Sequence, residues 1–114
     1  MNKDTIFINI RNNELKKAIL IAMADETSKA ILDATIDKPK RVEDVIVEKN
    51  IPRTSAYRKV GWLLSKQLLC IEKMERNIIN ESRYLHSRFI KILIQYRQGV
   101  IEIEAVPNKK ICGL

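Results

Sequence analysis

The sequence predicts an α+β fold, with four helices followed by two antiparallel β-hairpins, in one domain over residues 1–114. Apolar residues recur at helical spacing through much of residues 14–67. After Leu68 the apolar period changes from that of a helix to the alternation of a strand. A chain of 114 residues, 46% of them apolar and 31% charged, is also sufficient for one hydrophobic core.

The beginning of the chain predicts a short strand and a first helix. Residues 5–10 (TIFINI) are rich in β-branched side chains that alternate along the chain, which is typical of a strand. The polar residues that follow break this pattern, and Asn12 or Asn13 can cap a helix through its side-chain oxygen. Apolar residues at helical spacing then predict that helix over residues 14–24.

Two further helices are predicted before the middle of the chain. Asp25 can cap a helix over residues 26–36, and Pro39 prevents that helix from continuing. Residues 42–49 (VEDVIVEK) predict a short helix that Asn50 can end. The β-branched content of this segment would also allow a strand. We favour the helix because the charged side chains fall on the side opposite the apolar ones.

The rest of the chain is organised around a helix predicted over residues 53–67. Its buried stripe is predicted to consist of Ala56, Val60, Leu63 and Leu64. The opposite side carries Thr54, Arg58, Gly61 and Ser65. Such a surface suits a DNA major groove, because arginine can bond a guanine edge twice, hydroxyls bond bases or phosphates, and glycine permits close approach. An ordinary amphipathic helix with a solvated basic side has the same pattern.

Two hairpins and a tail complete the predicted fold. Residues 69–87 predict the first hairpin, with a turn near residues 76–81. Residues 89–106 predict an additional hairpin with its turn at Gln98 and Gly99, and Pro107 ends its second strand. Residues 108–114 predict a loose polar tail.

The net charge of +7 is concentrated in one part of the sequence. Residues 38–91 contain thirteen basic and six acidic residues, a net charge of +7, whereas residues 1–37 and 92–114 carry −1 and +1. The basic segment contains the helix predicted over residues 53–67. A local basic excess of this kind attracts a polyanion, and nucleic acid is the most common one.

The residues do not predict an enzyme. His86 is the one histidine and lies in a predicted strand, where a structural role is more common than a catalytic one. Asp33 and Asp37 are four residues apart, a spacing that is commonplace on solvated helix faces. The three glycines are isolated, so no glycine-rich phosphate loop is present.

Metals, cofactors and membranes are not predicted either. Cys70 and Cys112 have no second cysteine or histidine at metal-ligand spacing, so we expect no metal site, no disulfide framework and no cofactor. Two cysteines fit a reducing, cytoplasmic environment. The sequence shows no secretory signal and no apolar run long enough to span a membrane, and no segment combines a basic face with a bulky apolar one.

Several of these segments together resemble a known family. Residues 24–32 (ADETSKAIL), residues 42–69 (VEDVIVEKNIPRTSAYRKVGWLLSKQLL) and the paired strands beyond them are similar to winged helix-turn-helix regulators of the ArsR-like type. The resemblance covers roughly residues 14–87. It implies sequence-specific binding of double-stranded DNA and transcription regulation, with helix 53–67 in the major groove and hairpin 69–87 as the wing. It also implies a homodimer.

The sequence departs from this family at three points. Metal-sensing members carry cysteine or histidine ligands, whereas Cys70 falls in the wing strand without a partner. Pro52 stands where a hydroxyl capping residue is common, which leaves the first N–H groups of the helix to Thr54, Ser55 or water. The additional hairpin at 89–106 extends the minimal fold and could pack on the first strand or form a dimer surface.

The residues expected to contact DNA come from three segments. On helix 53–67 we expect groove contacts from Arg53, Thr54, Ser55, Tyr57 and Arg58, with Lys59 as a phosphate contact. Further phosphate contacts are expected from Lys38, Lys40 and Arg41 before the third helix, and from Lys73, Arg76 and Arg83 in the wing. Tyr57 could equally pack at the edge of the buried stripe, and Trp62 is expected to pack rather than to read bases.

Two alternatives use the same fold. One is a winged-helix module that binds a protein within a larger complex, which the apolar wing-tip residues Ile78 and Ile79 favour. The other is RNA binding.

Overall fold

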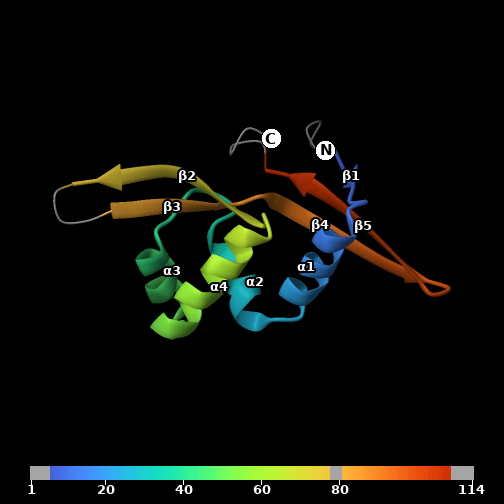
Figure 1. Ribbon diagram of the computed structural model, residues 1–114, viewed down its shortest axis with the longest axis horizontal. Coiled ribbons are helices and arrows are strands. Elements are labelled where there is room, and N and C mark those ends of the chain that lie inside the picture. The colour runs from blue at the N-terminus through green and yellow to red at the C-terminus, as the bar shows by residue number, and fades with distance from the viewer. Residues whose placement is uncertain (1–5, 78–80, 109–114) are drawn as a thin grey trace.

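In the described part of the chain, a two-residue strand precedes four helices and two antiparallel hairpins follow, which confirms the predicted α+β class (Figure 1). The computed structural model describes residues 6–77 and 81–108. The helices are α1 (Asn13–Met23), α2 (Glu26–Ala34), α3 (Val42–Lys49) and α4 (Arg53–Ser65). The strands are β1 (Ile8–Asn9), β2 (Leu69–Arg76), β3 (Glu81–Ser87), β4 (Phe89–Arg97) and β5 (Val100–Pro107).

Local capping residues set three of the helix boundaries in the described chain. Asn12 accepts a hydrogen bond from the backbone N–H of Leu15 at 2.9 Å, and Asp25 accepts one from Ser28 at 2.9 Å. Asn50 takes the left-handed conformation, with φ of 53°, and ends α3 as predicted. These three interactions involve neighbours in the sequence, which is why residue spacing alone could predict them.

Some predicted boundaries were wrong. The strand predicted at 5–10 has only two residues in the described part, Ile8 and Asn9, although the Ile10 N–H still bonds to Ile103 of β5 at 2.9 Å; Thr5 lies outside the described residues. α2 stops at Ala34, two residues early, because the Thr35 hydroxyl bonds back to the carbonyl of Ile31 at 2.9 Å. α4 likewise ends at Ser65 rather than 67, before Gln67 adopts a positive φ.

The predictions for the two ends of the sheets also differ from the structure. Pro107 closes β5 instead of following it. Asn108, predicted to begin a loose tail, is only 3% exposed, while residues 109–114 lie outside the described chain. The turn predicted at 76–81 includes residues 78–80, so Ile78 and Ile79 also lie outside the described residues.

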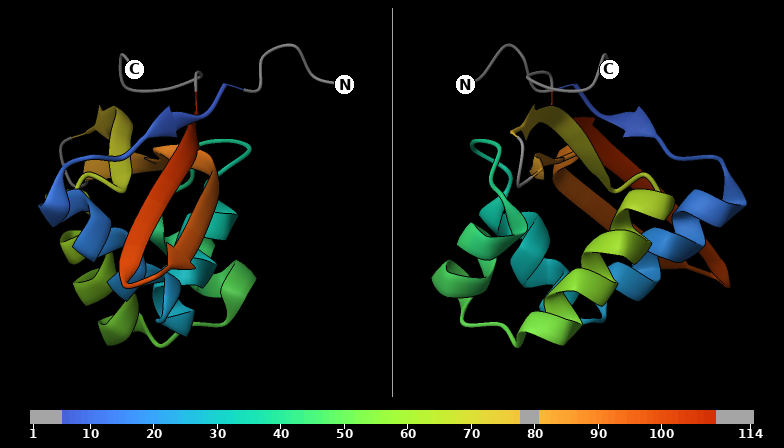
Figure 2. Two further views of the ribbon diagram at one scale, coloured as in Figure 1. Left: turned by 90° about the vertical axis from the view of Figure 1, so that its right-hand side faces the viewer. Right: turned by 60° about the vertical axis from the view of Figure 1, so that its left-hand side comes forward.

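The hydrophobic core lies between the helices and the roots of both hairpins. α1, α2 and α4 each bury one face, and the central side chains include Ile19, Ile31 and Leu63, all fully buried. Leu68 and Leu85 extend this core to the β2–β3 hairpin. All the helices consequently lie on one side of the strands, as two further views show (Figure 2).

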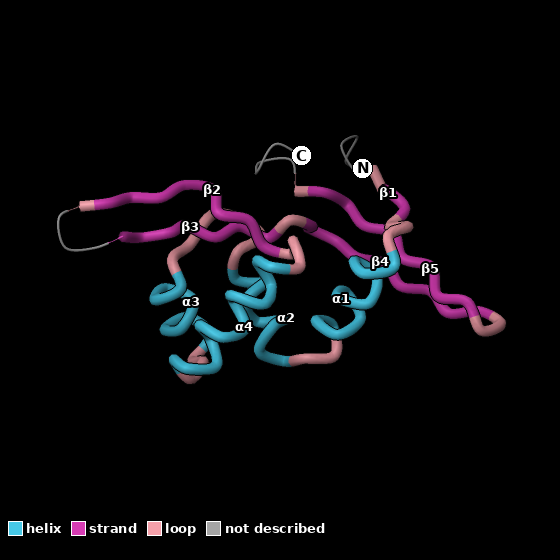
Figure 3. The backbone as a smooth tube through the Cα atoms, in the orientation of Figure 1, coloured by secondary structure: helices cyan, strands magenta, loops and turns pink. Residues whose placement is uncertain are grey.

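The two hairpins extend in opposite directions from the core (Figures 1 and 3). β2 pairs with β3, and Lys40 forms an isolated bridge to Leu85 on the other side of β3. The second sheet has the order β1-β5-β4. Only Arg88 separates β3 from β4. The hairpins therefore define the long dimension of the protein, whose extents are 54 × 31 × 24 Å.

A cluster of buried polar side chains joins these parts. Its members are Thr35, His86, Ser87 and Asn108, each no more than 3% exposed. The hydroxyls of Thr35 and Ser87 are 2.9 Å apart, and the Ser87 backbone N–H bonds to the Thr35 carbonyl at 2.9 Å. The Asn108 amide donates to the carbonyls of Ile36 and Ser87 at 2.9 and 3.2 Å. The end of α2, both hairpins and the end of β5 thus meet in one hydrogen-bonded cluster.

The cluster predicts that Thr35→Val destabilises the protein although valine has nearly the same shape. The substitution removes the hydroxyl that bonds to Ile31 and Ser87, and we expect a loss of about 1–3 kcal/mol in the free energy of unfolding. Urea denaturation measures this loss. Thr54→Val is the matched control, because Thr54 is exposed and its change should stay within about 0.5 kcal/mol. Equal effects of the two substitutions would contradict the structural role of the cluster.

Candidate nucleic-acid interface

α4 has a fully buried face and an exposed one. Ala56, Val60 and Leu63 are at most 2% exposed and pack in the core. The predicted outer stripe of Thr54, Arg58, Gly61 and Ser65 is exposed along its whole length. This arrangement holds the helix rigidly while its polar side remains accessible to a ligand.

A tight turn positions α4 beside α3. Asn50, Ile51 and Pro52 form the connection, and Ile51 anchors it because its side chain is 8% exposed. Pro52 occupies the N-cap position without a side-chain hydrogen bond, and no acidic residue lies in the first turn of α4. The other three helices each have an acidic residue there. The first N–H groups of α4 therefore keep an uncompensated partial positive charge.

Tyr57 connects the exposed side of α4 with α3. Its hydroxyl donates a hydrogen bond to the Glu43 carboxylate, and the Arg53 guanidinium lies 5.1 Å from its ring centre. The bond lowers the pKa of Glu43 and raises that of Tyr57, while the positive charges of Arg53 and Arg83 act in the opposite direction on Tyr57. Tyr57 is 38% exposed, so it both packs and remains accessible.

Many of the predicted phosphate contacts are ion-paired. The pairs and their N–O distances are Lys40–Glu48 at 2.6 Å, Arg41–Asp44 at 3.0 Å, Lys59–Asp25 at 3.3 Å, Lys73–Glu75 at 3.7 Å and Arg76–Glu81 at 2.7 Å. Lys59 thus points toward the start of α2 and not along the outer stripe. Among the described residues, no acidic oxygen lies within 4 Å of the charged groups of Lys38, Arg53, Arg58 and Arg83.

The structure therefore divides the predicted site into two groups. Arg53, Thr54, Tyr57 and Arg58 lie together on the exposed side of α4, and Ser55 is half-buried beside them. Arg83 on β3 is near enough for its charge to act on Tyr57. Lys40, Arg41, Lys59, Lys73 and Arg76 are held by acidic neighbours, whereas Lys38 has none within 4 Å among the described residues. The i,i+3 spacing of Arg41 and Asp44 makes their pair visible in the sequence, whereas no spacing predicts the Tyr57–Glu43 contact.

The β2–β3 hairpin is attached through an irregularity in its ladder. Glu72 is the extra residue of a bulge, and its carboxylate is 2.9 Å from Nδ1 of His86. Nε2 of His86 is 3.0 Å from the carbonyl oxygen of Ile36. His86 is 1% exposed, so it serves as a structural connection between the hairpin and the loop after α2.

Comparisons with models of protein families, with curated proteins and with solved structures find no match for this chain. Within residues 6–77 and 81–108, no group of three or more His, Cys, Asp or Glu side chains could hold a metal ion. Over the same described ranges, no helix is long and apolar enough to cross a membrane.

The Tyr57–Glu43 bond predicts a specific pH dependence. The bond is the largest cause of the lowered Glu43 pKa, so Tyr57→Phe should raise that pKa toward its ordinary value. A lowered folded-state pKa stabilises the protein above the unfolded-state pKa, and this contribution is lost as the pH falls through the folded-state value. The variant should therefore be less stable than wild type at pH 7, and the difference should shrink below about pH 4.

NMR titration of the Glu43 carboxyl and urea denaturation at both pH values measure this effect. Tyr84→Phe is the matched control, because the Tyr84 hydroxyl bonds Glu75 at 2.9 Å and not Glu43. An unchanged Glu43 titration in Tyr57→Phe would show that the bond does not persist in solution.

Proposed function

We propose that this protein binds double-stranded DNA in a sequence-specific way and regulates transcription. In this proposal the helices and the β2–β3 hairpin act as a winged helix-turn-helix, with α4 in the major groove and the hairpin as a wing on the backbone or minor groove. The observation that carries the proposal is the exposed polar side of α4, where Arg53 and Arg58 have no acidic oxygen within 4 Å among the described residues, on a helix whose other face is fixed in the core.

Gly61 gives this stripe a feature that the fold itself does not require. A Cβ at this position would meet no atom of the described chain within 4 Å, and the glycine has no positive φ. Glycine inside a helix is less favourable than alanine by about 0.8–1 kcal/mol. A gap between Arg58 and Ser65 allows a DNA backbone or base edge to approach the helix closely, which supports the groove assignment.

The amino end of α4 suits a phosphate. Its first N–H groups lack a side-chain cap, and Arg53 supplies a full positive charge beside them. Arg83 and Lys38 are further cations of the basic segment, and within residues 6–77 and 81–108 neither has an acidic oxygen within 4 Å. Glu43 introduces a carboxylate near this surface, but the Tyr57 hydroxyl and the Arg53 charge offset it. The ion-paired lysines can also contact phosphates, because an exposed ion pair contributes only about 0–1 kcal/mol to stability and is easily exchanged.

A salt titration with duplex DNA tests the proposal. If about six phosphates are neutralised, the affinity should fall on the order of a thousandfold between roughly 50 and 200 mM salt. Fluorescence anisotropy with a labelled random duplex measures the slope, and competition with double-stranded RNA separates DNA from RNA binding. Absence of duplex binding at low salt would instead favour the module that binds a protein partner.

Two arginine variants separate base reading from phosphate contact. Arg58→Ala should weaken binding to a site selected from a random library by about 1–3 kcal/mol more than binding to random duplex. Arg83→Ala should weaken both by similar factors and reduce the salt slope by about one unit. Neither should alter the unfolding midpoint much, because both side chains are exposed. An unchanged ratio of specific to random binding in Arg58→Ala would show that α4 does not read sequence.

A further inference from the structure

β4 lies at the edge of its sheet in the described chain. The sheet order is β1-β5-β4, so β5 covers one side of β4 and the described part of the chain leaves the other side unpaired. Its sequence, FIKILIQYR, is rich in the β-branched and aromatic residues that favour strands. An uncovered edge of this kind is a template for pairing with another strand.

The hydrogen bonds of β5 show which backbone groups of β4 point to this edge. The carbonyls of Ile101 and Ile103 bond to the Lys16 ammonium at 3.2 Å and to the Ile10 N–H at 2.9 Å, on the side of β5 away from β4. Their partners in the ladder are Tyr96 and Ile94. In an antiparallel ladder these are non-hydrogen-bonded pairs, so the N–H and C=O groups of Ile92, Ile94 and Tyr96 point outward.

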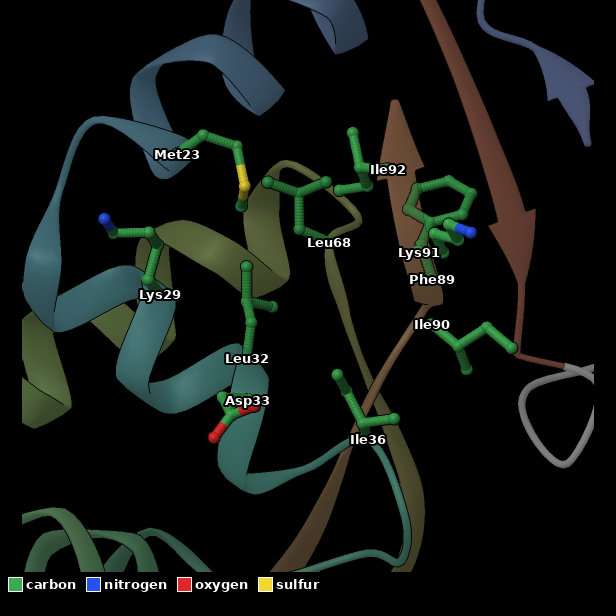
Figure 4. A pocket seen from close by; sticks show the side chains of 10 residues that line it. All are labelled: Met23, Lys29, Leu32, Asp33, Ile36, Leu68, Phe89, Ile90, Lys91 and Ile92. Carbon is green, nitrogen blue, oxygen red and sulfur yellow. The ribbon is translucent and has the colours of Figure 1, made fainter. Parts of the chain in front are cut away.

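A groove borders the same edge at the beginning of β4. It has a volume of about 290 Å³ and is lined by Met23, Leu32, Ile36, Leu68, Phe89 and Ile92, among others. Figure 4 shows Met23, Leu32, Leu68 and Ile92 converging between β4 and the helices, with Lys29 and Asp33 at the rim. The groove is therefore shaped for apolar side chains, with polar groups at its mouth.

The other end of β4 carries side chains that fit such a groove. Ile94 and Tyr96 lie on the same face of the strand as Ile92, because successive side chains alternate. They are 39% and 71% exposed, so this end of the strand extends beyond the core. Tyr96 combines an apolar ring with a hydroxyl that can bond at a polar rim. One strand thus carries both the projecting side chains and the groove.

We infer that β4 pairs antiparallel with β4 of a second copy of this chain about a two-fold axis at Leu93. Ile92 is then opposite the partner's Ile94 and Lys91 is opposite the partner's Gln95, which brings the partner's Tyr96 to the bulge at Ile90, the extra residue of the β4–β5 ladder. Each copy inserts Ile94 and Tyr96 over the partner's groove. The outward N–H and C=O groups of Ile92 and Ile94 form the hydrogen-bonded pairs of a continuous six-stranded sheet.

Charge and side-chain alternation favour this register over those with the axis nearer the hairpin turn. A two-fold axis normal to the sheet requires opposed residues to lie on the same face. The axis must therefore pass through a residue that lies opposite its own copy, and each alternative register moves the axis to another such residue. An axis at Ile94 would put Lys91 directly opposite the partner's Arg97, and like charges in that position are destabilising. An axis at Gln95 would leave both grooves without Tyr96. The inference concerns the protein without DNA and does not rest on the proposed function.

Sedimentation equilibrium of the full chain without DNA tests the pairing. The wild type should have twice the chain mass of 13.2 kDa at micromolar concentration. Ile94→Lys buries an unpaired charge at the interface and should raise the dimer dissociation constant on the order of a hundredfold or more. Val47→Lys is the matched control, because Val47 is 82% exposed on α3, and it should leave the dimer unchanged. Circular dichroism should show both variants folded.

A crosslink tests the register and does not depend on the folding of Ile94→Lys. In a chain carrying Cys70→Ser and Cys112→Ser, Leu93→Cys places two cysteines in a non-hydrogen-bonded pair with Cα atoms about 4.5 Å apart, within disulfide reach. Oxidation should give a covalent dimer. Gln95→Cys is the control, because its two copies would lie about 13 Å apart and should not crosslink.

Two results would overturn the inference. One is a wild type that is monomeric at micromolar concentration. The other is a dimer that Ile94→Lys does not weaken and that Leu93→Cys does not crosslink. Both results leave duplex binding by a single chain measurable. A failure of this pairing is therefore distinguishable from a failure of DNA binding.

Discussion

The hydrogen bonds between Thr35 and Ser87 are the contact on which the arrangement of this protein depends. They hold the end of α2 against the junction of the two hairpins, where His86 and Asn108 add further bonds. Each bond contributes only about 1 kcal/mol net, but an unpaired polar group at a buried position costs more than that. Apolar packing alone is compatible with several positions of the strands on the helices. The paired polar groups can form their hydrogen bonds in only one of these positions.

The core contacts of α4 hold this surface helix rigidly and leave its outer face free of structural tasks. The buried face of α4 is part of the core, and its outer face makes few contacts that the fold needs. The uncapped start of the helix and the glycine at position 61 both lower local helix stability. The core contacts of Ala56, Val60 and Leu63 compensate, so that features unfavourable to an isolated helix can persist where a ligand would use them.

The sequence predicts what neighbouring residues decide and misses what distant ones decide. The helix at 42–49, its end at Asn50 and the cap at Asp25 follow from local chemistry, and the structure has all three. The burial of Asn108 depends on Ser87 and Ile36, which lie 21 and 72 positions earlier in the chain. The sequence neighbours of Asn108 indicate only a tail. In the candidate site, the two faces of α4 were predictable from periodicity. The ion pair that turns Lys59 toward Asp25, across 34 positions, was not.

The single-residue connection between β3 and β4 has a mechanical consequence. The backbone N–H of Arg88 bonds to Leu68 at 3.0 Å, and its carbonyl accepts from Asn108 at 2.8 Å, so the joint is clamped on both sides. The hairpins therefore cannot swing as independent arms, and a torque applied to one reaches the other through the clamped joint. A ligand that binds one hairpin therefore also fixes the orientation of the other hairpin.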